Sequence, residues 1–403
     1  MKLFKNFLIL GLSVLTIVAC NDDEDEEVTP TTNNQTTNAS QTYDLASLAG
    51  SGVSGNAVIT DNDDGTITLD LNVSGTSAGN SHPAHIHYNT AAEGGGIAVS
   101  LNPVDGGTGS SSTTFSTLSD NTPISYSELL NFDGYINIHL SSTNLGTVVA
   151  QGDIGQNDLT GTTKTYTLGS KAVAGIQGDI EFAERVNGEA LAVISLQNTP
   201  AGGKHPAHIH MNSAIEGGGI ALALDTVMGS TGMSVTNISM MNGQSFGYSE
   251  LLNYDGYVNV HLSADSLNVI VAQGDIGSNE LTGTSKSYTL AEVGTSGVSG
   301  NVLFSQRKSG ETLAKISLNG TPANGSHPAH IHMNDITTTG GVVFGFPNVD
   351  GSTGESETNI NALNDGTPFL YNDILSYNGY VNVHLSANNL STIVAQGNIG
   401  SNE

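Results

Sequence analysis

The sequence lacks several residue types that common classes of functional site require. It contains no tryptophan and a single cysteine, Cys20, among 403 residues. A lone cysteine excludes an internal disulfide framework and a metal site made of thiolates. Lysine and arginine together number ten against 38 acidic residues, which gives a net charge of −28. A chain this negative repels a polyanionic backbone, so nucleic acid is not an expected partner.

What the sequence does contain is a threefold repeat organised around histidine. The motif His-Pro-Ala-His-Ile-His occurs at 82–87, 205–210 and 327–332, at intervals of 123 and 122 residues, and one further histidine follows each copy on an apolar run. Repeats of about 120 residues have the size of single domains, so we expect three domains with separate cores. These four positions in three copies account for all the histidines of the chain: His82, His85, His87, His139, His205, His208, His210, His261, His327, His330, His332 and His384.

The residues before the first repeat have a different composition. Lys2 and Lys5 precede an apolar run that is too short to span a bilayer, which predicts a signal peptide over residues 1–19. The next residue, Cys20, ends an Ile-Val-Ala-Cys segment that resembles a bacterial lipobox, and this resemblance implies lipidation of Cys20. The acidic block behind it resembles the surface-export signal of Bacteroidota lipoproteins, with a solvated charge run as the alternative. We therefore expect an acidic and Thr/Asn-rich tether at 20–42 and an outer membrane lipoprotein exposed at the cell surface.

The remaining chain has the patterns of β structure. Fifty glycines, many in Thr-Gly, Asp-Gly and Asn-Gly steps, predict frequent turns. Every second residue from Ile67 to Val73 is apolar, which is the period of a half-buried strand. We expect an all-β fold of three tandem β-sandwich or Greek-key barrel domains with little helix. The expected domains are 43–155, 166–277 and 288–400, with short joints outside the folding units at 156–165 and 278–287.

The histidines of one repeat are expected to converge. On a strand, residues i and i+2 point to the same face, so His85 and His87 share a face while the isoleucine between them faces the core. The run 135–140 alternates in the same way and carries His139. If the two strands are neighbours, three imidazoles meet in one polar patch, and His82, just before the strand, adds a fourth. A histidine site without thiolate or carboxylate suggests copper or zinc.

Residues close to the histidines receive lesser roles. Strict alternation places Leu140 behind the histidine face, and it places Met211 and Met333 on the core side, so these methionines are expected to pack and not to bind copper. Glu93 and Glu216 lie near the motif, but the third copy has no acidic residue there, which argues against a ligand common to all repeats. The alternative interpretation of the whole pattern is structural: the histidines hydrogen-bond to nearby loops and hold the glycine-rich segments.

The order of these motifs resembles a known family. His-Pro-Ala-His-Ile-His, then Gly-Gly, then Tyr-Val-Asn-Val-His, then Gln-Gly-Asp-Ile is similar to the CHRD domain, named after chordin, and covers essentially 43–400 as three tandem copies. The resemblance implies a β-rich extracellular domain of poorly defined biochemical function, which in chordin belongs to a growth-factor-binding protein. The family often has Ile-Arg-Gly where this chain has Ala-Gln-Gly, so no role of that arginine is expected here.

The two histidine strands are also similar to the copper-ligand strands of copper/zinc superoxide dismutase. This resemblance implies copper at His85, His87 and His139 and at their equivalents in the other copies. The chain lacks the zinc-bridging histidine and the disulfide, and its only arginines, Arg185 and Arg307, lie upstream of the histidines. The negative chain would also repel superoxide. We therefore expect the fold without the enzyme activity.

Three functions remain open from the sequence. The first is a non-enzymatic surface lipoprotein, attached to the membrane through Cys20, whose three domains each hold copper or zinc. The second is an adhesion or scaffold protein with structural histidines, whose loops contact an extracellular protein or a glycan. The third is a redox enzyme of the dismutase type. Chemistry by paired carboxylates is not expected, because acidic residues change to asparagine in the third copy at two positions: Asp133, Asp255 and Asn378, and Asp153, Asp275 and Asn398.

Overall fold

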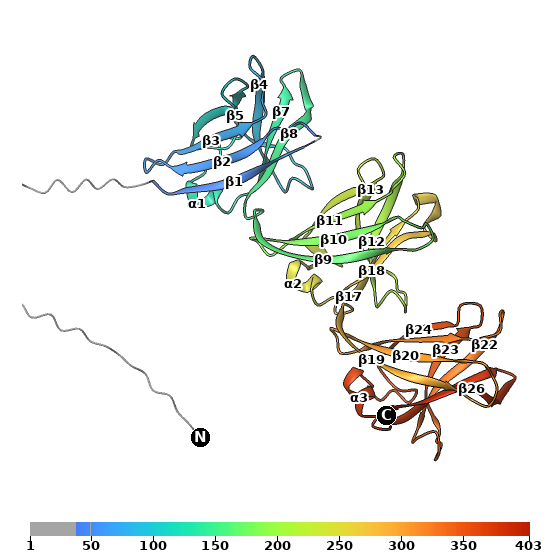
Figure 1. Cartoon of the computed structure of the whole chain (residues 1–403). Coiled ribbons are helices and arrows are strands. Elements are labelled where there is room, and N and C mark those ends of the chain that lie inside the picture. Colours follow the sequence, from blue (N-terminus) through green and yellow to red (C-terminus); the bar gives the residue numbers. More distant parts are fainter. Residues whose placement is uncertain (1–37, 49) are drawn as a thin grey trace, which may run out of the picture. The chain divides into compact units, whose positions relative to one another are not determined.

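The computed structural model describes residues 38–48 and 50–403, and most of them lie in β-strands (Figure 1). Three successive segments each form a closed barrel of eight strands. The all-β class is therefore confirmed, in its barrel form. The expected signal peptide, Cys20 and most of the tether lie outside the described residues. Among the residues that are described, no helix has the length and apolar character needed to cross a membrane.

The first barrel shows the topology that all three share. Its strand order is β1-β2-β3-β6-β5-β4-β7-β8, and β1 pairs with β8 to close the barrel. The connection from β3 to β4 passes two strands, which is a Greek-key feature. Its elements are β1 (Ser40–Ser47), β2 (Ser54–Asp61), β3 (Ile67–Ser74), β4 (Ser81–Tyr88), β5 (Ile97–Asp105), β6 (Ser110–Phe115), α1 (Tyr126–Leu129), β7 (Asp133–Ser141) and β8 (Asn144–Gly155).

The other two barrels repeat this order. The second contains β9 (Leu159–Ser170), β10 (Gln177–Arg185), β11 (Ala190–Gln197), β12 (Lys204–Met211), β13 (Ile220–Met228), β14 (Met233–Ile238), β15 (Met240–Met241), β16 (Gln244–Ser245), α2 (Tyr248–Leu251), β17 (Asp255–His261), η1 (Ala264–Ser266) and β18 (Ile270–Gly277). The third contains β19 (Leu281–Glu292), β20 (Ser299–Arg307), β21 (Thr312–Asn319), β22 (Ser326–Met333), β23 (Val342–Asp350), β24 (Glu355–Ile360), α3 (Tyr371–Ser376), β25 (Asn378–Ser386) and β26 (Asn389–Gly400).

Each barrel has a separate apolar core. On β3 the burial alternates residue by residue from Ile67 to Val73, as the sequence predicts. On the two histidine strands, Ile86 of β4 and Ile136 of β7 are fully buried. Burial of such a side chain contributes about 1.5–3 kcal/mol. Because β4 pairs directly with β7, the core holds both strands in register and leaves their histidines together on the opposite face.

The joints between repeats are shorter than expected. Strand β9 begins at Leu159 and pairs with β10 through Thr163–Thr165, so most of the segment 156–165 belongs to the second barrel. Strand β19 begins at Leu281 and pairs with β20 in the same way. The Leu-Thr-Gly-Thr segments are therefore the starts of strands, and few residues separate one barrel from the next.

Two predictions made from strict alternation are wrong. Leu140 is 40% exposed, because the register of β7 against β8 shifts on both sides of His139 and such an irregularity changes the direction of a side chain. Met211 and Met333, which were expected to pack on the core side, are each 46% exposed. They follow a register shift of the motif strand against its neighbour at the last motif histidine.

Candidate metal site

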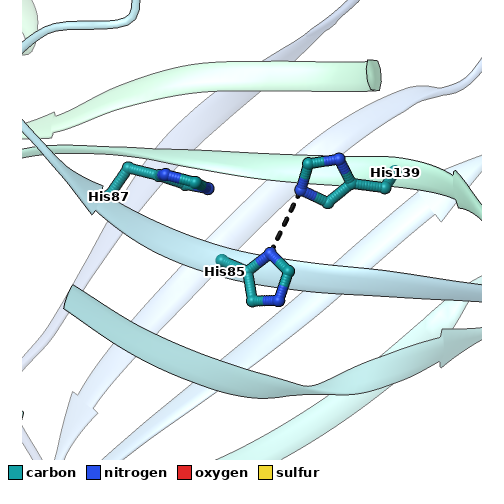
Figure 2. Close-up of side chains that lie close together, drawn as sticks. All are labelled: His85, His87 and His139. Atoms are coloured by element: carbon teal, nitrogen blue, oxygen red, sulfur yellow. Dashed lines mark hydrogen bonds between the residues drawn. The ribbon is translucent and has the colours of Figure 1, made fainter. Parts of the chain in front are cut away.

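The structure brings together three histidines of each repeat. In the first repeat β4 supplies His85 and His87, and β7 supplies His139 (Figure 2). One ring nitrogen of each histidine lies within 4.8 Å of the other two. The same arrangement occurs in the other repeats, and we call the three sets the triads: His85, His87 and His139; His208, His210 and His261; His330, His332 and His384. The expected convergence of two strand histidines with the later histidine is therefore confirmed.

Hydrogen bonds to the backbone determine which nitrogens face the centre of a triad. His87 Nδ1 lies 2.9 Å from the carbonyl oxygen of Gly95, and His139 Nδ1 lies 2.7 Å from that of Leu145. A carbonyl oxygen only accepts, so Nδ1 is the donor in both rings and the neutral ring keeps its lone pair on Nε2. The third ring is reversed: His85 Nδ1 lies 3.1 Å from His139 Nε2. Each triad thus offers two Nε2 atoms and one Nδ1 atom.

In the second and third repeats these nitrogens have no hydrogen-bonding partner in the protein. They are buried, and they are the same atoms in both repeats: His208 Nδ1, His210 Nε2 and His261 Nε2, and His330 Nδ1, His332 Nε2 and His384 Nε2. A buried polar group without a partner costs about 1–3 kcal/mol. Three such lone pairs at one point are satisfied together by a single cation, which fits the donor chemistry of a copper or zinc site.

The environment of two histidines in each triad favours the uncharged imidazole. Burial lowers the pKa of His85 below its ordinary value, and the adjacent rings of His139 and His87 lower it further. Burial also lowers the pKa of His139, against the opposing effect of its hydrogen bond to the Leu145 carbonyl. The pKa values of the equivalent residues in the other repeats shift in the same direction. Neutral imidazole is the form that coordinates a metal, so at neutral pH little proton release has to accompany binding.

A tyrosine and a glycine support the ring of His87. The Tyr135 ring stacks on it with centroids 5.0 Å apart and an interplanar angle of 18°, and the Tyr135 hydroxyl accepts a hydrogen bond from the Gly95 amide at 3.2 Å. A Cβ on Gly95 would lie 1.9 Å from the Tyr88 carbonyl oxygen. The glycine run after the motif therefore lets the loop fold back over the strand, where its carbonyl orients a triad ring. Both other repeats have the same contacts.

The fourth histidine of each repeat does not join the triad. His82 lies within β4, is 2% exposed, and places Nδ1 3.1 Å from the backbone carbonyl oxygen of His139. His205 and His327 make the same contact in their repeats at 3.2 Å. The clustered ring nitrogens leave these three histidines out. The structure thus corrects the four-histidine set to three, and the fourth holds the backbone of a triad residue.

The acidic residues near the motif are engaged elsewhere. Glu93 Oε2 accepts a hydrogen bond from the Thr90 hydroxyl at 2.7 Å, and Glu216 makes the same contact with Ser213 at 2.5 Å. Across residues 38–48 and 50–403, the groups able to hold a metal contain histidine alone. Periodicity did not reveal the supporting role of Leu145, which lies in the irregular first part of β8. Tyr135 shares the alternation of His139 on β7 and pairs directly with His87.

Comparison with known proteins adds one finding to this geometry. The family model described as the CHRD domain matches residues 23–151 and 278–393. The second repeat lies outside both matched segments but has the same strand order and the same triad. No curated protein and no solved structure matches the chain. The similarity to copper/zinc superoxide dismutase therefore stays a prediction from the histidine strands.

Proposed function

Because the chain belongs to the CHRD domain family, we propose that it is a non-enzymatic binding protein in which each repeat holds one copper or zinc ion. The observation that carries this proposal is the triad, in which three imidazole nitrogens from two paired strands lie within 4.8 Å of one another. Metal–nitrogen bonds of about 2.0–2.1 Å require such convergence. Small rotations of the side chains would bring the three nitrogens onto one ion.

The donor set points to a borderline or soft cation. Imidazole suits copper and zinc, whereas calcium and magnesium require oxygen ligands, which the triads lack. Three protein ligands also leave a coordination position for water or another group, as in open zinc sites. His87 and His139 are only 8% and 6% exposed, and His85 is the more exposed member. Water or another small group would therefore reach a bound ion from the His85 edge of the triad.

The hydrogen bonds around the triad are those expected of metal-binding histidines. Such residues usually donate their second ring N–H to a carbonyl or carboxylate, which fixes the ring orientation and the tautomer. His87 and His139 donate to the carbonyl groups of Gly95 and Leu145. These contacts orient two lone pairs before any ion arrives, so less ordering is needed on binding.

Charge argues against turnover of the dismutase type. The chain carries a net charge of −28, which opposes the approach of an anionic substrate. Its two arginines, Arg185 and Arg307, are each 1% exposed, so neither guides an anion to a triad. We therefore assign the metal to storage, sensing or stabilisation of the loops, in a protein attached to the cell surface through a lipid on Cys20.

A second candidate function is adhesion or scaffolding. The observation that favours it is that two rings of each triad already hydrogen-bond to loop carbonyls, as at Gly95 and Leu145. Histidines in this role would hold the loops without any metal. The Ser/Thr/Asn-rich loops would then contact an extracellular protein or a glycan.

Electron paramagnetic resonance of the copper-loaded chain separates these two functions. If the triads bind copper, the Cu(II) spectrum will show superhyperfine structure from directly bound nitrogen. The matched control replaces all nine triad histidines by alanine, and it should lose this structure. A spectrum of oxygen-bound copper that is the same in both chains would contradict metal binding at the triads and favour the adhesion function.

A further inference from the structure

The only two arginines of the chain are buried at the joints between repeats. Arg185, at the end of β10, is 1% exposed. Its Nη1 donates to Asp153 Oδ2 at 2.7 Å and to the carbonyl oxygen of Asn157, and its Nε donates to Asn237 Oδ1 at 2.8 Å. A buried guanidinium requires a charged partner, and here the partner belongs to the preceding barrel, because Asp153 lies on β8.

The second joint repeats this arrangement atom by atom. Arg307, at the end of β20, is also 1% exposed. It donates through Nη1 to Asp275 Oδ2 at 2.7 Å and to the carbonyl oxygen of Asn279 at 2.5 Å, and through Nε to Asn359 Oδ1 at 2.8 Å. The same three contacts at two joints indicate a built feature of the tandem array.

The residues held by Arg185 are those that anchor the loop of the preceding triad. The second carboxylate oxygen of Asp153 accepts a hydrogen bond from the Ala91 amide at 2.7 Å. The Asn157 side chain donates to the carbonyl oxygen of Asn89 at 3.1 Å. Asn89 and Ala91 begin the loop that ends at Gly95, whose carbonyl oxygen orients the ring of His87. An unbroken chain of contacts thus runs from an arginine of one repeat to a triad ring of the repeat before it.

Comparison of the three described repeats indicates that this pair belongs to joints and not to the barrel itself. In the first repeat Asn62 occupies the arginine position, and it donates to Thr66 and Thr68 of the same barrel. In the third repeat Asn398 occupies the aspartate position. Its Oδ1 still accepts from the loop, at the Ile336 amide, but at 3.1 Å. Each charge is therefore present only where a neighbouring repeat supplies its partner.

We propose that Arg185 and Arg307 are positioning residues that couple each triad to the repeat that follows it. This inference rests on the proposed metal function. By this account the metal sites of the first and second repeats depend on the arginine of the next repeat, whereas the site of the third repeat is independent. The array is then a directional series, in which the docking of one barrel orders the metal loop of the barrel before it.

The test uses full chains that each keep one triad, with the histidines of the other two replaced by alanine. Zinc affinity is measured by competition with a chromophoric chelator. Arg185→Gln should weaken zinc binding at the first site by about ten- to a hundredfold, the usual effect of losing an outer contact of a metal ligand. The same substitution should leave the third site within twofold of its original affinity. Lys315→Gln, which removes one positive charge from an exposed ion pair in the third repeat, is the matched control and should not change the first site.

A second variant covers the case in which Arg185→Gln does not fold. Asp153→Asn breaks the same charge pair, and Asn398 shows that asparagine can hold the loop. It should also weaken the first site, and the double variant should lose no more than the larger single loss, because both act on one interaction. Unchanged affinity at the first site in both single variants, with zinc still bound, would overturn this inference alone. Absence of zinc at every site of the unsubstituted chain would overturn the proposed function and this inference with it.

Discussion

Replacing His139 by alanine is expected to reduce the number of copper or zinc ions bound per chain from three to two. The substitution removes one of the three nitrogens that converge in the first triad, and the two that remain both come from β4. Because both remaining ligands lie on β4, the ion no longer links two strands. It is then held only as weakly as by any two histidines that lie two residues apart on one strand. Elemental analysis of a chain made without a histidine tag, after removal of free metal, measures the loss directly.

The matched control is His82→Asn in the same repeat. His82 hydrogen-bonds to the backbone carbonyl oxygen of His139, and an asparagine amide can also donate to a carbonyl. This variant should still bind three ions, with the first site weakened by at most about a hundredfold. Circular dichroism should show the same β content in both variants. The triad is incorrectly assigned if the His139→Ala chain keeps three ions. It is also incorrectly assigned if the His82→Asn chain loses one ion as completely as the His139→Ala chain does.

Saturation with metal is expected to stabilise every repeat against unfolding. At a free metal concentration about 100 times Kd, a site that exists only in the folded state contributes about 2.7 kcal/mol. His87 and His139 are 52 residues apart in the sequence, so the unfolded chain does not preserve the triad. For a domain of about 120 residues this stabilisation raises Tm by roughly 10 °C. Differential scanning calorimetry with metal, and again after addition of a chelator, measures the shift.

The control for this prediction is a chain in which all three triads are replaced by alanine. Its Tm should be the same with and without metal, because the remaining histidines, His82, His205 and His327, each stand alone. An equal rise of Tm in both chains would mean that the metal acts on the acidic surface and not at the triads. A rise limited to the third repeat would instead identify that repeat as the only one with a working site.

The sequence was sufficient to predict the face on which the triad forms. The alternation around Ile86 and Ile136 fixes the register of two strands, because a slip by one residue would expose the core set. This strong constraint is why the pairing of His85 and His87 with His139 was predictable. The Greek-key barrel was predicted only as one of two alternatives, since local patterns do not distinguish a closed barrel from two packed sheets.

Some features that the sequence did not predict depend on irregular backbone conformations. The register shifts beside His139 expose Leu140 against the alternation, and a β-bulge has no period by which to recognise it. The inclusion of His82 failed for a different reason: the sequence placed it before the strand, but it lies within β4 and alternates with Ala84 and Ile86, on the face opposite His85 and His87. The role of Gly95 depends on a loop that folds back over β4, which spacing along the chain does not reveal.

The change of aspartate to asparagine in the third copy also has a structural explanation. From the sequence, Asn398 indicated that a charge there is not essential to the shared fold, with a functionally weaker third copy as the alternative. In the structure Asp153 and Asp275 each pair with a buried arginine of the next repeat. Among the described residues, none that follows Asn398 is an arginine, so a carboxylate there would have no such partner among them. The difference between the repeats thus matches the presence or absence of the partner arginine.

The most direct test of the triads is X-ray diffraction at the metal absorption edge, on crystals grown with copper or zinc. We predict three anomalous peaks per chain, one in each repeat. In the first repeat the peak should lie about 2.0–2.1 Å from Nδ1 of His85 and from Nε2 of His87 and His139. Peaks confined to surface carboxylates, with no metal at any of the triads, would contradict the account.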